Sequence, residues 1–201
     1  MGTLETWMGP EDTGRAFPNG HGAGTTRVGE AAMEHRLVAC LHADVSGFSR
    51  LITEDVEETA RMLTSYQDMI GGLVVTHEGR VINVAGDSLL AAFPSVPAAV
   101  RCALEVQRQL QARNAGLPPH RRMQFRVGIE FGEVLVENGR LYGECVNVAT
   151  RVQEIAAPGR ICLTESAFDR VAPLLLPCDY LGERTVKNIE RPLRIYQIRS
   201  A

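Results

Sequence analysis

The sequence predicts an α+β domain in which helices pack on one face of a mostly antiparallel sheet. Of its 201 residues, 45% are hydrophobic and 22% are charged, which is typical of a globular chain with a sizeable core. Strand-like and helix-like stretches interleave from about residue 36 to the end, in the order βαββαββαβ. Short turns join several neighbouring strand-like runs, which favours hairpins over a doubly wound parallel sheet.

The first half of this region predicts a strand, a helix, a hairpin and a second helix. Residues 36–45 form a short apolar run that ends in a polar turn, as a buried strand does. Residues 56–76 place apolar side chains three or four positions apart, which indicates an amphipathic helix. The stretch 79–93 has two β-rich runs on either side of the turn at 85–88, and helical spacing returns at 97–112.

The second half predicts another strand pair followed by shorter elements. Residues 123–143 contain the pair, and 146–159 form a helix that Pro158 and Gly159 close. The remaining expected elements are strands at 160–164, 178–182 and 194–199, with a helix near 165–171.

Residues 1–33 differ in kind from the rest of the chain. They hold seven of the nineteen glycines and show neither helical nor strand periodicity. This composition predicts a flexible tail, with the folded domain at 34–201. Met33 is also a hypothetical alternative start, which the intact mass of the natively expressed protein would test.

Charge and cysteine content exclude several classes of partner. The formal net charge of −3 gives no general attraction to nucleic acid or to anionic membranes, and the aromatic content of 5% is low for a sheet that binds RNA. No apolar run approaches the roughly 20 residues that span a bilayer. The five scattered cysteines lack CxxC spacing, so we expect reduced thiols and a cytoplasmic protein.

Four polar residues are candidates for metal binding or catalysis. Asp44 ends a predicted strand and Asp87 lies in a predicted hairpin turn, positions from which carboxylates can bind Mg²⁺ together with substrate phosphates. The alternative is that Asp44 caps a helix and Asp87 satisfies its own turn. Asn147 and Arg151 share one helix face and could orient a sugar and neutralise a phosphoryl group, although arginines on helices are usually solvated. From spacing alone, both interpretations stay open.

Taken together, six stretches resemble the class III nucleotidyl cyclase catalytic domain, the family of adenylate and guanylate cyclases. They occur in family order and at family spacing from about Arg36 to Arg199. The stretches are HADVSGFSRL, EGRVINVAGDSLLAAFPSVPAAVRCALEVQ, FRVGIEFGEV, LYGECVNVATRV, APGRICLTE and LGERTVKNIERPLRIYQI.

The resemblance implies a ferredoxin-like βαββαβ core and a head-to-tail homodimer with active sites between the subunits. It also implies two divalent cations, Mg²⁺ or Mn²⁺, in each active site. By position, the implied metal residues are Asp44, Asp87 and the backbone of Val45; the implied phosphate contacts are Gly47, Phe48, Ser49 and Lys187; and the implied transition-state pair is Asn147 and Arg151.

Two positions depart from the pattern of the adenylate cyclases that the chain resembles. Those enzymes read adenine with a lysine four residues before the second metal aspartate, and with an aspartate, threonine or serine seven residues before the asparagine. Here the two positions hold Asn83 and Arg140. Arginine has donors only, so it would meet the 6-amino group of adenine donor to donor and would favour a carbonyl such as O4 of uracil. Arg140 could instead extend into water from its turn.

The sequence therefore predicts a nucleotidyl cyclase that makes a 3′,5′-cyclic nucleotide and pyrophosphate from a nucleoside triphosphate. UTP is the favoured substrate, and a separate effector would read the product, cUMP, as in the bacterial pyrimidine cyclases of antiphage signalling that the chain resembles. The first alternative is an adenylate cyclase that makes cAMP from ATP. The second is a non-catalytic module that senses nucleotides through the same fold.

Overall fold

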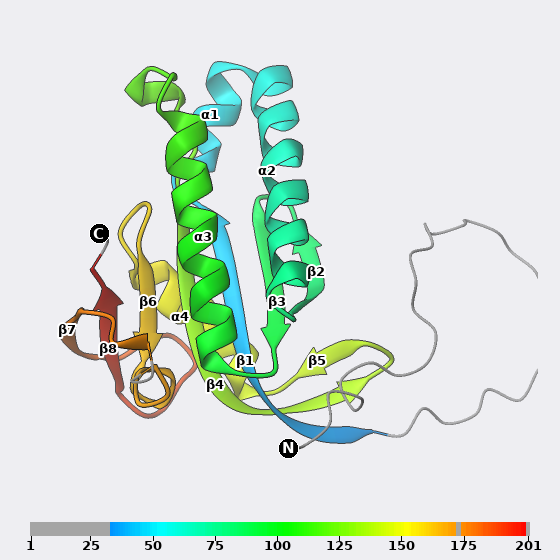
Figure 1. Ribbon diagram of the computed structural model, residues 1–201, viewed down its shortest axis with the longest axis vertical. Helices are drawn as coiled ribbons and strands as arrows, with labels where there is room; N and C mark the ends of the chain where they lie inside the picture. Colours follow the sequence, from blue (N-terminus) through cyan, green and yellow to red (C-terminus); the bar gives the residue numbers. More distant parts are fainter. Residues whose placement is uncertain (1–32, 172–173, 200–201) are drawn as a thin grey trace, which may run out of the picture. The chain divides into compact units, whose positions relative to one another are not determined.

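An eight-stranded sheet forms the centre of the residues that the computed structural model describes, 33–171 and 174–199 (Figure 1). The strand order is β2-β3-β1-β4-β6-β8-β7, with the short β5 paired to β4. All neighbours are antiparallel except β4 and β6. The strands are β1 (Glu34–Val45), β2 (Arg80–Ala85), β3 (Ser88–Phe93), β4 (Phe125–Glu137), β5 (Arg140–Tyr142), β6 (Ile161–Thr164), β7 (Cys178–Arg184) and β8 (Leu193–Ile198).

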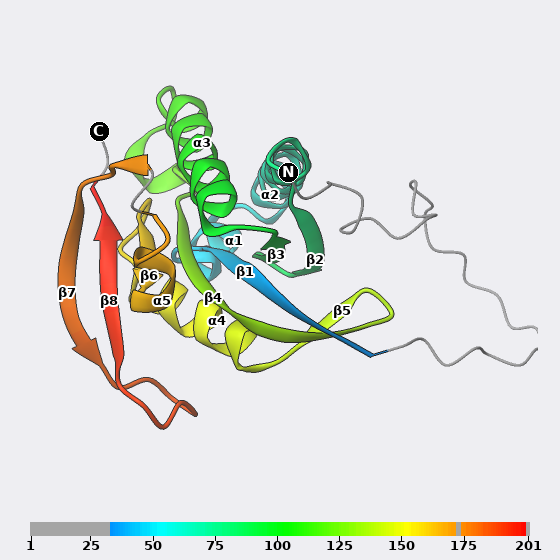
Figure 2. The ribbon, with the colours of Figure 1, turned by 60° about the horizontal axis from the view of Figure 1, so that its bottom comes forward.

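Helices cover the sheet from both sides, which corrects the expectation of one covered face. The helices are α1 (Phe48–Glu54), α2 (Val56–Thr76), α3 (Val96–Asn114), α4 (Glu144–Ile155) and α5 (Glu165–Phe168), with a 3₁₀ turn at Pro119–Arg121. Figure 2 shows α2 and α3 on one side of β1 and β4, and α4 on the other. The run from Val38 to Leu41 is buried at every position, because β1 is packed on both of its faces.

The predicted ferredoxin-like centre is present. The elements β1, α2, β2, β3, α3 and β4 follow one another as βαββαβ, and their strands lie in the order β2-β3-β1-β4. Both helices of this unit lie on the same face of the sheet, so the one-face expectation holds for this unit and fails for α4, which follows it.

Helix α2 forms where the spacing predicts it, because a capping residue precedes it and its apolar side chains lie on one face. Asp55 accepts a hydrogen bond from the backbone N–H of Glu58 at 2.9 Å and so caps the first turn. The buried side chains at Leu63, Tyr66 and Ile70, three or four residues apart, face the core.

Helix α1 was not predicted, since it is short and buries only Leu51. It begins after Gly47, whose φ of 70° lies in the left-handed region that glycine tolerates. The two later helices are shorter than expected, because α4 ends at Ile155, before Pro158, and α5 ends at Phe168.

Three further expectations concern the cysteines, membrane-spanning helices and the N-terminal tail. All five cysteines are free thiols, as expected, and all of them except Cys178 are buried. None of the helices within 33–171 and 174–199 is both long and apolar enough to cross a membrane. The proposed tail at 1–33 lies outside the described residues except for its last one, so that prediction stays a prediction.

Candidate active site

The structure brings Asp44 and Asp87 to the same end of the sheet. Asp44 is paired in register with Ser88, the residue after Asp87, so the β2–β3 turn folds directly beside the end of β1. Both aspartates are half-buried. Burial raises the pKa of Asp87, and the negative charge of Asp44 acts in the same direction.

The turn that carries Asp87 is held from two directions. Gly86 has a φ of 59°, and its carbonyl accepts a hydrogen bond at 2.8 Å from Gln67 Nε2 on α2. Ser88 Oγ donates to the carbonyl of Ala85 at 2.9 Å. Asp87 is therefore presented by a fixed backbone rather than by a free loop.

These aspartates fit a divalent cation that also binds substrate. No group of three or more His, Cys, Asp or Glu side chains in the described part of the chain could hold a metal by itself. Mg²⁺ is commonly bound by one or two carboxylates, with substrate phosphates and water completing its shell. The pair Asp44 and Asp87 meets that requirement, and Val45 follows Asp44 with its backbone at the same strand end.

The turn of Gly47, Phe48 and Ser49 follows the same strand end. Gly47 is the N-cap of α1, and no side chain caps this helix. Phe48 packs against the core, whereas Gly47 and Ser49 are exposed. Their position two to four residues after Val45 places this backbone next to the aspartates in the chain.

A second group of predicted residues lies on α4. Val148 and Val152 of α4 are fully buried, whereas Asn147 is exposed and Arg151 is half-buried. Arg151 forms an ion pair with Glu154 at 2.5 Å. The guanidinium is thus held near the surface of the helix, one turn from the amide of Asn147.

Helix α4 lies over the sheet face that carries Asp44. The residues on either side of Asp44 in β1, Ala43 and Val45, belong to the core beneath α2 and α3, so Asp44 faces the opposite way. His42 shares this orientation. Burial lowers its pKa, and Gln153 and Glu154 of α4 act on it in the opposite direction.

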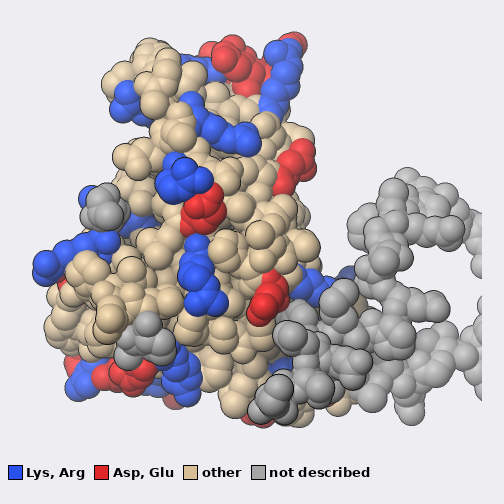
Figure 3. All heavy atoms as spheres, viewed as in Figure 1, with Lys and Arg blue, Asp and Glu red and all other residues tan. Residues whose placement is uncertain are grey.

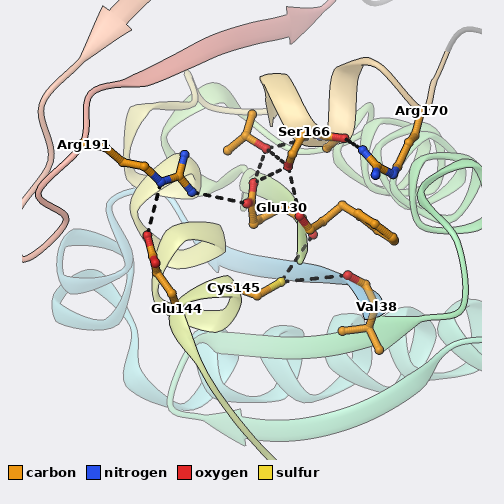
Figure 4. Close-up of polar contacts among 10 residues, drawn as sticks. Val38, Glu130, Glu144, Cys145, Ser166, Arg170 and Arg191 are labelled. Carbon is orange, nitrogen blue, oxygen red and sulfur yellow. Dashed lines mark hydrogen bonds and ion pairs between the residues drawn. The ribbon is translucent and has the colours of Figure 1, made fainter. Parts of the chain in front are cut away.

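Lys187 lies in the connection between β7 and β8, which packs on α4. Its side chain is exposed, but Ile189, two residues later, is buried against Val148 and Val152. Arg191 closes the connection by an ion pair with Glu144 at 3.5 Å, at the start of α4 (Figure 4). The structure therefore brings the Lys187 connection onto the helix of Asn147 and Arg151.

Glu130 is a buried carboxylate that the sequence reasoning missed. Its side chain is 6% exposed, and it accepts hydrogen bonds from Thr164 Oγ1 and from Ser166 Oγ, the latter at 3.0 Å (Figure 4). Arg191 Nη2 lies 4.0 Å from its Oε1. Burial raises its pKa despite these partners. A charged residue inside the apolar run of β4 was the available signal.

Arg126 is a second missed residue, and it lies at the aspartates. It stands opposite Asp44 in the β1–β4 ladder, and its Nη2 is 3.4 Å from Asp44 Oδ1.

Asn83 and Arg140, the predicted base-reading residues, are both exposed, on β2 and at the start of β5. The side chain of Arg80, at the start of β2, lies against Gly139 in the turn before β5. A Cβ added to Gly139 would lie 2.8 Å from Arg80 Nη2. The Arg80 side chain thus reaches the residue that precedes Arg140.

The molecular surface shows no extended basic region on the face in Figure 3. Lysine and arginine side chains there alternate with aspartate and glutamate. That distribution agrees with the net charge of −3 and does not favour nucleic acid on this face.

Comparison with known proteins gives a consistent family. Residues 30–200 match the family described as adenylate and guanylate cyclase catalytic domain. The chain is 36% identical over 172 residues to "Putative adenylate cyclase 3" of Rhizobium meliloti (strain 1021), covering 84% of this chain and 29% of that protein. It is 31% identical over 137 residues to the adenylate cyclase of Streptomyces coelicolor, covering 68% of this chain and 34% of that protein. The chain thus spans about a third of the length of these relatives.

Solved structures agree with this assignment. The adenylate/guanylate cyclase/hydrolase from Silicibacter pomeroyi superposes with a TM-score of 0.78 at 36% identity, covering 83% of this chain and 98% of that one. The adenylyl cyclase CyaB from P. aeruginosa shares the fold, with a TM-score of 0.73 at 20% identity over 85% of this chain and 97% of that one. On the match over 30–200 and these similarities, the chain belongs to the adenylate and guanylate cyclase catalytic domain family.

Proposed function

We propose that this domain converts a nucleoside triphosphate into a 3′,5′-cyclic nucleotide and pyrophosphate. The observation that carries the proposal is the pairing of Asp44 and Asp87 at one end of the sheet, next to the turn of Gly47, Phe48 and Ser49. In the reaction, the ribose 3′ oxygen forms a bond to the α-phosphorus while the bond from that phosphorus to pyrophosphate breaks, and the 3′ proton leaves to solvent. No covalent intermediate with the protein is needed, so positioning and charge provide the acceleration.

Each residue has a role that its placement supports. Asp44 and Asp87, with the backbone of Val45, would hold two Mg²⁺ or Mn²⁺ ions, which supply Lewis-acid activation of the 3′ hydroxyl and neutralise the leaving group. The turn of Gly47, Phe48 and Ser49 would contact the phosphates, as would Lys187. Arg151 would neutralise charge on the phosphorus in transit, and Asn147 would orient the ribose.

We propose that the active unit is a homodimer with composite sites. The aspartates would come from one subunit and Asn147 and Arg151 from its mate. Exposure of Asn147 and Lys187 supports this arrangement, because both side chains are free to meet a second chain.

UTP is the proposed substrate, on the strength of Arg140 and Asn83. A guanidinium donates to O4 of uracil but opposes the 6-amino group of adenine. ATP is the second candidate, and the names of the Rhizobium and Streptomyces relatives support it. A cUMP product would be read by a separate effector, as in antiphage signalling.

The substrate experiment uses the dimer with each of the four triphosphates and Mn²⁺, and product detection by mass spectrometry. Faster turnover of UTP than of ATP is expected. The double variant N83K/R140D should reverse that order, because it offers adenine an acceptor for its 6-amino group. Faster turnover of ATP by the unchanged protein contradicts the base assignment and leaves the cyclase activity standing.

Catalysis itself is tested by Asp87→Ala, for which a loss of at least ~100-fold is expected, the size typical of removing a charge-stabilising group. The matched control is Asp68→Ala, at an exposed position on α2, which should keep full activity. A non-catalytic nucleotide sensor, the remaining alternative, would form no cyclic product with any triphosphate and would be unaffected in its output by Asp87→Ala.

A further inference from the structure

Arg126 is a positively charged side chain placed against the proposed metal ligands. It lies on β4, directly opposite Asp44 on the neighbouring strand, so the sheet itself fixes the pair on one face. Its Nη2 is 3.4 Å from Asp44 Oδ1. The two side chains are only 27% and 25% exposed, which limits screening of their charges by water.

The turn that carries Asp87 lies beside this ion pair, because Ser88, the residue after Asp87, is the partner of Asp44 on β3. The Nε of Arg126 is buried and has no hydrogen-bond partner among the described residues. The group is therefore held at this position by its charge and by packing rather than by a complete set of hydrogen bonds.

We propose, building on the function above, that Arg126 is a positioning residue that serves as the resident counter-cation of the aspartate pair. It keeps Asp44 and Asp87 together when no metal is bound, and it weakens their affinity for a free divalent cation. The triphosphate reverses this repulsion, because its own negative charge is attracted by the guanidinium. Arg126 thereby favours loading of metal together with nucleotide over loading of metal alone.

The test measures Mn²⁺ binding to the nucleotide-free protein by the loss of the free Mn²⁺ signal in electron paramagnetic resonance. Arg126→Gln should bind Mn²⁺ about tenfold more tightly than the unchanged chain, a size expected for removing one like charge at a few ångströms in a partly screened site. Arg126→Lys keeps the charge and should remain close to the unchanged chain. Arg101→Gln, the same change at an exposed position of α3, should have no effect.

A second readout separates charge from packing. Without metal, Arg126→Gln should melt at a lower temperature in low salt, since the two carboxylates then repel each other unopposed. Saturating Mn²⁺ should raise its melting temperature by more than it raises that of the unchanged chain.

The outcomes distinguish this inference from the proposed function. Asp44→Asn should abolish Mn²⁺ binding. If it does so while Arg126→Gln binds Mn²⁺ equally or more weakly, the aspartate site stands and the counter-cation role is overturned. If Asp44→Asn still binds Mn²⁺ like the unchanged chain, the metal site is elsewhere and both proposals fail.

Discussion

Gly128 of β4 shows how one residue fixes the position of α4. A Cβ at this position would lie 2.2 Å from the backbone N of Gln153 and 2.4 Å from the carbonyl O of Ala149. Both atoms belong to the helix backbone, so no side-chain movement can make room. The helix that carries Asn147 and Arg151 approaches the sheet this closely only because residue 128 is glycine.

We therefore expect Gly128→Ala to reduce the free energy of unfolding by about 3 kcal/mol, the upper range for overpacking a core. Cyclase activity should fall with it, because α4 must shift. Gly71→Ala, in open space on α2, should instead stabilise by about 0.5–1 kcal/mol through helix propensity. Urea unfolding of both variants checks this, and equal stability of the two would contradict the proposed contact.

The buried carboxylate of Glu130 makes stability depend on pH. Its pKa in the folded chain is raised above the ordinary value of 4.5, so the fold favours the protonated form. The stability this group contributes is complete below that value and is lost as pH rises through its folded pKa. Glu130→Gln removes the titration.

The advantage of Glu130→Gln over the unchanged chain should therefore increase as the pH rises from about 4 to about 7. Urea unfolding at the two pH values measures it. Glu57→Gln, at a position that is 83% exposed on α2, is the control and should show no such change. A constant difference between Glu130→Gln and the unchanged chain would mean that Glu130 does not titrate in this range.

For single residues, the sequence predicted which side chains matter better than it predicted which side chains they contact. The carboxylates of Asp44 and Asp87 were expected from their places at strand ends, and the structure brings them together. Arg126 and Glu130 were not expected, because their importance comes from neighbours on other strands, Asp44 for one and Thr164 for the other. Spacing along one strand contains no information on that register.

Among the elements, the connection between β7 and β8 depends on few contacts. Arg191 joins Glu144 and Glu130 (Figure 4). Ile189 packs on α4, while Lys187 itself stays exposed. Arg191→Ala should loosen this connection and raise KM for the triphosphate about fivefold, the size of one partly exposed ion pair, with a smaller effect on kcat.

A double-mutant cycle tests that expectation by steady-state kinetics. Because the effect acts through Lys187, Arg191→Ala should add little in a Lys187→Ala background. Arg194→Ala is the matched control, since Arg194 pairs with Glu165 and Glu183 and not with α4. Equal effects of the two arginine variants would show that the Glu144 and Glu130 contacts do not position Lys187.

Long elements were predicted with their ends, whereas short ones were predicted less accurately. The stripe of α2 extends over 21 residues and gave both ends correctly, whereas α1 has seven residues and one buried side chain. The second covered face was also missed. The continuous apolar run in β1 was the available signal, because a strand that is packed on both faces lacks the apolar and polar alternation of a half-exposed strand.

For the whole molecule, the proposed homodimer predicts complementation between inactive variants. Asp87→Ala and Arg151→Ala damage opposite halves of a composite site, so a mixed dimer retains one intact site of two. With random exchange of subunits, half of the dimers are mixed, and activity should recover to about one quarter of the unchanged protein. An equimolar mixture assayed for cyclic product tests this. No recovery in the mixture, with mixed dimers verified by differently tagged chains, contradicts composite sites.

Helices α2 and α3 lie on one side of the sheet and α4 on the other, which separates the main hydrophobic core from the helix that carries proposed catalytic residues. The large apolar core lies beneath α2 and α3, and Asn147 and Arg151 lie on α4, on the other side of the sheet. Directed evolution can exploit this division. Libraries confined to the α2 and α3 side should yield heat-resistant descendants with unaltered kinetics, and libraries on the α4 side should yield new substrate preferences at constant melting temperature.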